Sequence, residues 1–389
     1  MSDKVRILIV DDDDIYRSFL SMIIKDIPGV ELVGVAGNGQ VALSKLKSRS
    51  VDLVLLDLVM PIMNGLETLK HIRHDFPDVA VVIISGIYAE DADSVVEALQ
   101  IGALDYVSKM GDSGDSISSD LHLRLNTIIG LVSSRKTMRS ARLTVGNKAP
   151  VRKGLKKPER TPVIIDQMSM VAPPVTVKQP SRPALPAKIA VVTIAASTGG
   201  PNALLEVIPK LPGDLGVPVL VVQHMPAHLT ASFAESLARK SSLTVREAAN
   251  GEEILPNVVY IAPGGRHTIV KPDQINPLTS GRRFIWQNDD PPENSVRPAA
   301  DVLFKSMGMV YGGNILVVIL TGMGYDGANG VRAMKDKGCY CLSQTEDTCV
   351  VYGMPRAVDD AGLSDEKVPL DLIAFRIVGI IKGTGEKMA

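Results

Sequence analysis

Three residues that together can hydrolyse an ester or an amide follow apolar runs in the second half of the sequence. Ser197 comes directly after IAVVTIAA, His224 directly after VPVLVVQ, and Asp326 shortly after ILVVILT. A histidine can take the proton of a serine hydroxyl, and a carboxylate can orient the imidazole and stabilise its protonated form. If the three runs are parallel strands of one sheet, their carboxyl ends share an edge. The sequence therefore predicts a site for nucleophilic acyl transfer at that edge.

The surroundings of this serine limit the class of hydrolase. The chain order Ser, His, Asp differs from the Ser, Asp, His order of α/β-hydrolases, and Ser197 is not part of a G-x-S-x-G sequence. The glycines at 199 and 200 begin an expected helix, whose N–H groups could bind an oxyanion. Each residue also has an ordinary interpretation: Ser197 and Thr198 could cap the helix, and His224 and Asp326 could be turn residues.

A second group of polar residues follows the apolar runs of the first half. Asp11 and Asp12 come after VRILIV, and Asp57 comes after VDLVLL. Three carboxylates at one sheet edge would repel one another unless a hard cation neutralised them, and Mg²⁺ suits such oxygen ligands. Ser85 and Lys109 end two further expected strands and add a hydroxyl and a cation. We expect one anion site that holds Mg²⁺ and accepts a phosphoryl group.

The elements that must position these residues form two α/β series. Strand-like runs (VRILIV, ELVGVA, VDLVLL, VAVVIIS and ALDYV) alternate with helical patterns in the first part, with Asp13 and Asp14 expected to cap the first helix and a fifth helix expected from about Ser116. A segment rich in Pro, Lys and Arg follows, and a second series contains IAVVTIA, VPVLVVQ, VVYIA and ILVVILT. We predict two doubly wound parallel-sheet domains, residues 1–130 and 188–389, joined by a flexible linker, residues 131–187.

Composition excludes several classes of protein. The 389 residues are 45% hydrophobic and 22% charged, which is typical of a globular protein of two domains. A net charge of −1 gives no general reason to bind nucleic acid or an anionic membrane. We found no secretory signal and no apolar stretch of about 18 residues, so no membrane insertion is expected. The three cysteines favour a cytoplasmic protein with buried thiols over a disulfide framework or a metal site (Cys339, Cys341 and Cys349).

The first domain resembles a two-component receiver domain, a flavodoxin-like fold. The resemblance rests on DLVMPIMNG from Asp57, on SG at 85–86 and on DYVSK before Met110, where the family usually has proline. It implies that Asp57 accepts a phosphoryl group from a histidine kinase. The other implied roles are Mg²⁺ binding by Asp11, Asp12 and Asp57, phosphate sensing by Ser85 and Lys109, and an aromatic switch at Tyr106.

The second domain resembles the catalytic domain of the chemotaxis protein-glutamate methylesterases, the CheB family, with a Rossmann-like fold. The shared motifs are AASTGGP, VVQHMP, YIAPGGRH, LTGMGYDGANG and VVYGMPR. The resemblance implies that Ser197 is the nucleophile, His224 the general base and then acid, and Asp326 the carboxylate that orients it. It also places Thr198 beside the nucleophile and the backbone N–H of Met323 at the oxyanion. The family usually reads close to H-R-P-S where this chain has residues 296–299, VRPA, so polar contacts there are expected to differ.

The resemblance implies a phosphorylation-activated serine hydrolase that demethylates glutamate methyl esters on chemoreceptors and deamidates certain glutamines. A histidine kinase of the CheA type would be the phosphodonor, and the hydrolase would need no cofactor. We expect the unphosphorylated receiver to cover the catalytic edge. Two other classes are a DNA-binding response regulator, which would use the basic segment Arg152 to Arg160, and a non-catalytic scaffold. Which receptors and which signalling array it serves, and whether deamidation is retained, do not follow from the sequence.

Overall fold

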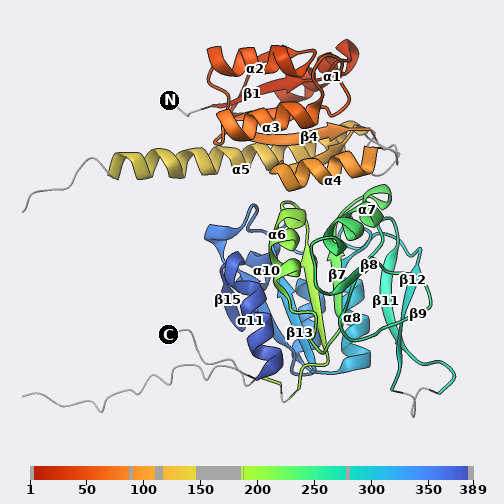
Figure 1. Cartoon of the computed structure of the whole chain (residues 1–389). Coiled ribbons are helices and arrows are strands. Elements are labelled where there is room, and N and C mark those ends of the chain that lie inside the picture. Colours follow the sequence, from red (N-terminus) through yellow and green to blue (C-terminus); the bar gives the residue numbers. More distant parts are fainter. Residues whose placement is uncertain are drawn as a thin grey trace, which may run out of the picture.

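The computed structural model describes residues 4–86, 91–109, 117–145, 185–186, 188–276 and 281–383. Met110 and the basic segment Arg152 to Arg160 lie outside the described residues, as does most of the expected linker. The described parts form two α/β domains, each built on a parallel sheet (Figure 1). The predicted fold class is confirmed, whereas the predicted domain boundaries stay predictions.

The first domain is a five-stranded parallel sheet with helices on both faces. Its strands stand in the order β2-β1-β3-β4-β5, the flavodoxin-like order, and all except the edge strand β2 are largely buried. The strands are β1 (Val5–Val10), β2 (Val30–Ala36), β3 (Leu53–Leu56), β4 (Ala80–Ser85) and β5 (Asp105–Ser108). The helices are α1 (Asp14–Lys25), α2 (Gly39–Ser48), α3 (Gly65–Asp75), α4 (Ala92–Ile101) and α5 (Ile117–Val145). Helices α1 and α5 cover one face of the sheet, and α2, α3 and α4 cover the other.

The start of α1 and the end of α5 can be compared with what the sequence predicted. Asp13 is the N-cap of α1, as expected, and its carboxylate accepts the backbone N–H groups of residues 15 and 16. Helix α5 continues to Val145, well into the segment expected to be linker. Among the side chains that the structure describes, apolar residues of α5 pack on the sheet as far as Val132, and Lys136 beyond them binds the domain by donating to Asp52 and to a backbone carbonyl. The receiver therefore holds the helix beyond residue 130, where the linker was expected to begin.

The second domain is a seven-stranded, wholly parallel sheet in the order β15-β14-β13-β6-β7-β10-β8. Its strands are β6 (Val191–Ala196), β7 (Val219–Gln223), β8 (Thr244–Glu247), β10 (Val258–Ile261), β13 (Ile315–Ile319), β14 (Tyr340–Gln344) and β15 (Glu366–Val368). A small antiparallel sheet beside it contains β9 (Glu252–Glu253), β11 (His267–Pro272) and β12 (Arg283–Asn288). The four strands predicted from the sequence are β6, β7, β10 and β13.

Helices cover both faces of this sheet as well. Helices α6, α7 and α11 pack on one face, and α8, α9 and α10 on the other. These helices are α6 (Gly200–Val207), α7 (Ala227–Ala238), α8 (Ala300–Tyr311), α9 (Ala328–Lys335), α10 (Met354–Asp360) and α11 (Leu370–Lys382). Short 3₁₀ turns are η2 (Ile208–Lys210) and η3 (Glu346–Thr348). No helix of the described residues is long and apolar enough to cross a membrane. Cys339 and Cys341 are buried, Cys349 is partly buried, and none of the three forms a disulfide.

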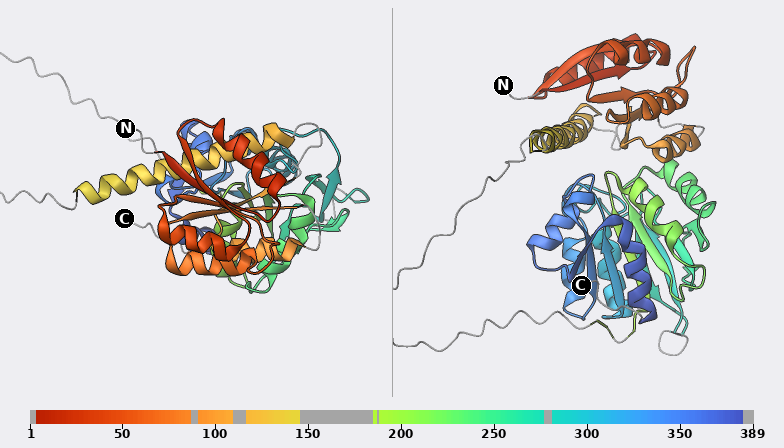
Figure 2. Two further views of the ribbon diagram at one scale, coloured as in Figure 1. Left: turned by 90° about the horizontal axis from the view of Figure 1, so that it is seen from above. Right: turned by 60° about the vertical axis from the view of Figure 1, so that its left-hand side comes forward.

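The two domains pack against each other. Helix α4 of the first domain lies on α6 and α7 of the second, as two views of the chain show (Figures 1 and 2). One buried apolar cluster contains residues from both sides of this contact. Gln100 on α4 donates to Ser236 and accepts from Lys240 Nζ at 2.8 Å, and Asn202 Nδ2 donates to the carbonyl of Ala103 at 2.8 Å. The interface is therefore both apolar and hydrogen-bonded.

Candidate active site

The strand order brings the three candidate catalytic residues to one place. Ser197 directly follows β6, His224 directly follows β7, and Asp326 lies on the loop after β13; these three strands are neighbours in the order β13-β6-β7. The chain leads from β6 to β7 on one side and from β13 to β14 on the other, so a crevice is expected between β6 and β13 at the carboxyl ends of the strands. The structure thus groups the three residues as the sequence predicted, although it assigns them no role.

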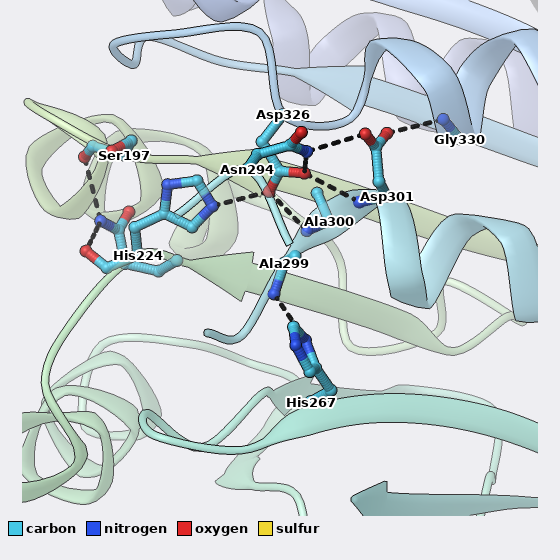
Figure 3. A network of polar contacts seen from close by, with 10 residues as sticks. Ser197, His224, His267, Asn294, Ala299, Ala300, Asp301, Asp326 and Gly330 are labelled. Atoms are coloured by element: carbon cyan, nitrogen blue, oxygen red, sulfur yellow. Dashed lines mark hydrogen bonds and ion pairs between the residues drawn. The ribbon is translucent and has the colours of Figure 1, made fainter. Parts of the chain in front are cut away.

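His224 lies between the other two residues (Figure 3). Its Nε2 is 2.8 Å from Asp326 Oδ2, and both side chains are buried, with exposed fractions of 7% and 3%. Because Nε2 faces Asp326, a proton from another group would have to be taken by Nδ1. In the described part of the chain no hydrogen bond joins Ser197 Oγ to the ring, and contacts of this kind in enzymes often tighten only when substrate is bound.

Asp326 is held by more than the histidine. Its Oδ2 also accepts the backbone N–H of Ala300 at 2.6 Å, and its Oδ1 accepts the N–H of Asp301 at 3.1 Å. These groups begin α8, whose N-cap residue, Ala299, has no capping side chain. Asp326 therefore supplies the missing cap from a distant loop. Burial raises the pKa of Asp326, but the hydrogen bond from His224 and those two N–H groups lower it more, so that the pKa lies below its ordinary value.

Two glycines allow the backbone to pack closely on both sides of Ser197. The loop after β13 touches the serine: a Cβ on Gly322 would lie 2.8 Å from Ser197 Cβ, so only glycine fits there. Met323 follows on this loop, which brings its backbone close to the serine. On the other side Gly199 has φ 74° and lies against Val350, where a Cβ would be 2.4 Å from the valine Cβ. Thr198 stands between, its carbonyl accepting the hydroxyl of Thr321 at 3.0 Å.

The sequence analysis missed two amides that connect the site. Gln223 is fully buried, and its Nε2 donates to the carbonyls of Ser197 at 2.9 Å and His224 at 3.1 Å, which joins the two loops. Asn294 donates through Nδ2 to Asp326 Oδ1 at 2.8 Å and to Asp301 Oδ2 at 2.9 Å (Figure 3). A glutamine at the end of an apolar strand was the available signal for the first residue. The second lies on an irregular loop, and nothing in the sequence marked it.

His267, from the YIAPGGRH motif, has a structural place. It is fully buried; its Nε2 contacts the carbonyl of Pro291 at 3.0 Å, and its Nδ1 accepts the backbone N–H of Ala299 at 3.2 Å. It thereby fixes the segment that leads into α8. In this segment Val296 and Ala299 occupy the positions of the polar residues in the H-R-P-S motif. A serine at 299 could have capped α8, and here Asp326 caps the helix instead.

The carboxylates of the first domain also meet as predicted. Ligand oxygens of Asp11, Asp12 and Asp57 lie within 4.8 Å of one another, so the three carboxylates form one acidic cluster with the oxygen donors that a divalent cation such as Mg²⁺ prefers. Lys109 Nζ bonds to Asp11 at 2.7 Å and to Asp57 at 3.0 Å. Burial, aided by Asp11 and opposed by Lys109, raises the pKa of Asp57 to about 6.

The two remaining predicted residues lie on the neighbouring strands. Ser85 is buried at the end of β4, next to β3, which leads into Asp57. Tyr106 on β5 is also buried, and its hydroxyl donates to the carbonyl of Gly86 at 3.2 Å. The Tyr106 ring meets the edge of His228 on α7, with centroids 6.4 Å apart. Tyr106 thus touches both the strand that carries Ser85 and the second domain.

Comparisons with known proteins agree with this architecture. The CheB methylesterase family model matches residues 192–377, and the response regulator receiver domain model matches residues 7–118. The protein-glutamate methylesterase/protein-glutamine glutaminase of Desulfotalea psychrophila is 38% identical over 390 residues, covering 97% of this chain and 99% of that protein. The chain belongs to the CheB methylesterase family. The protein of the same name from Geobacillus kaustophilus is 39% identical over 378 residues, covering 97% of this chain and 99% of that protein. A crystal structure of the Thermotoga maritima CheB methylesterase catalytic domain matches at 38% identity with a TM-score of 0.47, covering 50% of this chain and 99% of that one.

In this CheB-family chain the receiver reaches the residues next to the candidate nucleophile. The side chain of Thr198 lies close enough to Asp105, at the start of β5, to favour the charged form of that carboxyl group. Burial raises the pKa of Asp105, against the opposing effects of Arg124 and of Thr198. Val350, which packs against Gly199, also packs against the apolar cluster under α1 and α5 of the receiver. The receiver therefore contacts both sides of the serine loop.

Proposed function

We propose that this chain hydrolyses glutamate methyl esters on chemoreceptors, and deamidates certain glutamines there, with Ser197 as nucleophile. The bond between His224 and Asp326 at the carboxyl ends of neighbouring strands, beside Ser197, carries the proposal. An aspartate whose pKa is lowered stays ionised and can stabilise the protonated imidazole. The relatives named protein-glutamate methylesterase/protein-glutamine glutaminase support the substrate class.

The first half of the reaction forms an acyl-enzyme. Ser197 Oγ attacks the ester carbonyl while its proton passes to His224 Nδ1, and the carbonyl oxygen becomes an oxyanion. The backbone N–H of Met323, on the loop that touches the serine, is our candidate donor to that oxyanion. Collapse of the intermediate breaks the bond to the methoxy group, which takes the proton from His224 and leaves as methanol. A glutamine substrate would release ammonia at the same step.

The second half restores the serine. Water gives a proton to His224 and attacks the glutamyl ester of Ser197, and the second tetrahedral intermediate collapses to a free glutamate side chain. The serine oxygen recovers the proton from His224. No metal is required by these steps, because the proton carrier and the oxyanion donors are protein groups.

Labelling with a serine-reactive phosphonate tests this assignment directly. We expect the purified full chain to be modified at Ser197 and to release methanol from membranes that carry methylated receptors. The Ser197→Ala variant should lose both, whereas Ser241→Ala, which changes a serine near the opposite end of β8, should keep both. Label that persists on Ser197→Ala, at another serine, together with methanol release would refute the assignment.

We also propose that phosphorylation of Asp57 by a CheA-type histidine kinase activates the enzyme, with Mg²⁺ held by Asp11, Asp12 and Asp57. A phosphoryl group adds about −1.5 to −2 charge and acceptor oxygens that Lys109 and Ser85 can meet. Lys109 now binds two of the carboxylates, so it would have to exchange partners. When bound, the cation neutralises the acidic cluster. The reaction would take place in the cytoplasm, and no nucleic acid is needed.

We propose further that the unphosphorylated receiver covers the catalytic loops through the contacts of α4 and β5. Gln100→Lys would place a cation against Lys240 and should weaken that contact. We expect faster demethylation of soluble receptor fragments by the unphosphorylated variant and a smaller change toward a small ester. Glu97→Lys is the control, because Glu97 on the same helix pairs with Lys70 inside the receiver. If Gln100→Lys is no faster than wild type on fragments and slower on assembled arrays, the receiver acts by recruitment.

A further inference from the structure

Asn294 occupies an unusual position between two buried carboxylates. It donates to Asp326 Oδ1 at 2.8 Å and to Asp301 Oδ2 at 2.9 Å through the same nitrogen (Figure 3). Both partners offer only acceptors, so the amide group must face them with its two hydrogens. Asp301 is completely buried, and its other oxygen accepts the N–H of Gly330 at 2.6 Å.

The backbone at Asn294 is shaped to deliver this amide. Glu293 and Val296 form an isolated antiparallel bridge, with Val296 N donating to the carbonyl of Glu293 at 3.1 Å. Asn294 and Ser295 between them have φ values of 56° and 64°, the pattern of a type I′ turn. Asparagine tolerates this left-handed conformation better than most residues. An ion pair between Glu293 and Lys305 fastens the turn to α8.

From this geometry we infer that Asn294 is a positioning residue of the hydrolase, which holds Asp326 toward His224 and keeps the paired carboxylates from sharing a proton. Without the Asn294 amide, the carboxylates of Asp326 and Asp301 would face each other across a buried gap. Two negative charges so close together favour the uptake of a proton by one of them. A protonated Asp326 cannot stabilise an imidazolium. The inference rests on the proposed triad.

The expected pH dependence of activity follows from the charges around the Asn294 amide. Burial raises the pKa of Asp301, while the pKa of Asp326 is lowered. Loss of the amide should raise the pKa of Asp326, because one donor is lost and the negative charge of Asp301 is no longer screened. Activity should then be lost at a higher pH than in wild type as the solution is acidified. The titratable groups that face the amide are Asp301 and Lys305 on α8, Asp326, His224 and Glu293.

The test measures methanol release from methylated receptor membranes by the full chain, treated with Mg²⁺ and acetyl phosphate. Asn294→Gly removes the amide but keeps a residue that accepts positive φ. We expect kcat to fall about 10- to 100-fold, in line with loss of a hydrogen bond to a charged group, with KM little changed and the acid limb of the pH profile moved upward. The matched control is Asn257→Gly. Asn257 also has positive φ, at 62°, but it lies before β10 at the opposite end of the sheet.

A second variant separates donation from packing. Asn294→Asp keeps the size of the side chain but leaves at most one hydrogen to donate, and only when the added carboxyl group takes up a proton between its two carboxylate neighbours. Its kcat should therefore fall to about the level of Asn294→Gly, with the acid limb of the pH profile also moved upward. If Asn294→Asp stays within twofold of the Asn257→Gly control, the inference is wrong, whether or not Asn294→Gly folds. Ser197→Ala is measured beside them: if it remains active, the triad itself fails, and that failure is distinct from the failure of this inference.

Discussion

Replacing Asp326 by asparagine keeps the shape of the side chain but turns one of its two acceptor oxygens into an NH₂ group, which donates. The carboxylate now accepts only, from His224 Nε2, Asn294 Nδ2 and the N–H groups of Ala300 and Asp301. In Asp326→Asn the new NH₂ group must face two donors in either orientation. If it faces the histidine, the ring must carry its proton on Nδ1, and Nδ1 can then no longer accept the proton of Ser197.

The size of the effect can be worked from the geometry. The His224 and Asp326 atoms are 2.8 Å apart, and both side chains are buried, so screening by water is weak. For unit charges roughly 3 to 4 Å apart at an effective dielectric constant of about 20, the attraction is about 4 to 6 kcal/mol. This attraction exists only when the imidazole is protonated in the transition state. At about 1.4 kcal/mol for each factor of ten, kcat should fall by about three to four orders of magnitude.

The assay is methanol release from methylated receptor membranes at saturating substrate, using phosphodonor-treated full chain. Asp365→Asn is the matched control, because Asp365 is also buried in this domain but pairs with Lys335 away from the catalytic strand ends. Thermal unfolding of both variants shows whether the fold is kept. A kcat for Asp326→Asn within tenfold of the Asp365→Asn value would show that the carboxylate charge does not act in the transition state.

Ser197→Ala should lower turnover by several orders of magnitude and leave the unfolding midpoint unchanged, and near-normal methanol release by the purified variant would contradict the assignment. His224→Ala should be almost as severe, and the double variant no worse than Ser197→Ala, because the residues act as one unit; losses that add would show that they act separately. Asp57→Asn should abolish labelling by acetyl phosphate and the activation that follows, while basal activity persists, and removal of Mg²⁺ should do the same; phosphorylation at the usual rate in a chelator would exclude the cation. Asp52→Asn should lower the free energy of unfolding of the chain by about 2 kcal/mol at pH 7. Burial raises the pKa of Asp52, but hydrogen bonds from Arg6 and Lys136 outweigh it and lower this pKa from 3.8 to about 2. A carboxyl group whose pKa is lowered in the folded state stabilises the fold at pH values above its unfolded pKa, and this stabilisation is lost as the pH falls toward the folded pKa of about 2. Denaturant titrations at pH 3 should therefore show roughly half of the difference in unfolding free energy between wild type and Asp52→Asn that is measured at pH 7. An equal difference at both pH values would contradict this explanation.

The strands that lead to the candidate catalytic residues were predictable because they are buried on both faces. The β6, β7 and β13 runs are almost wholly apolar, so each one stands out and its carboxyl end can be located. The edge strands are different. β8 reads TVRE and β15 reads EKV, and such short polar segments become strands only because a neighbouring edge is available to pair with them.

The supporting residues of the site were harder to predict for a related reason. Asn294 and Asp301 contact Asp326 from positions 32 and 25 residues away in the chain, Asn294 through its amide and Asp301 through its backbone N–H. Asn294 lies on an irregular loop and Asp301 at the start of α8, and neither follows a strand, so only the folded structure shows that they meet Asp326. The choice of His224 Nε2 as the partner of Asp326 is likewise a property of the ring orientation, which the sequence does not contain.

The apolar cluster formed by α4, α6 and α7 buries side chains of both domains in one common core. Two domains joined in this way should unfold as one cooperative unit, so calorimetry of the unphosphorylated chain should give a single heat-absorption peak. If phosphorylation separates the domains, the newly hydrated apolar surface adds to the heat capacity of the native state, and the peak should split in two. The melting profile would then report the signalling state of the molecule without reference to any substrate.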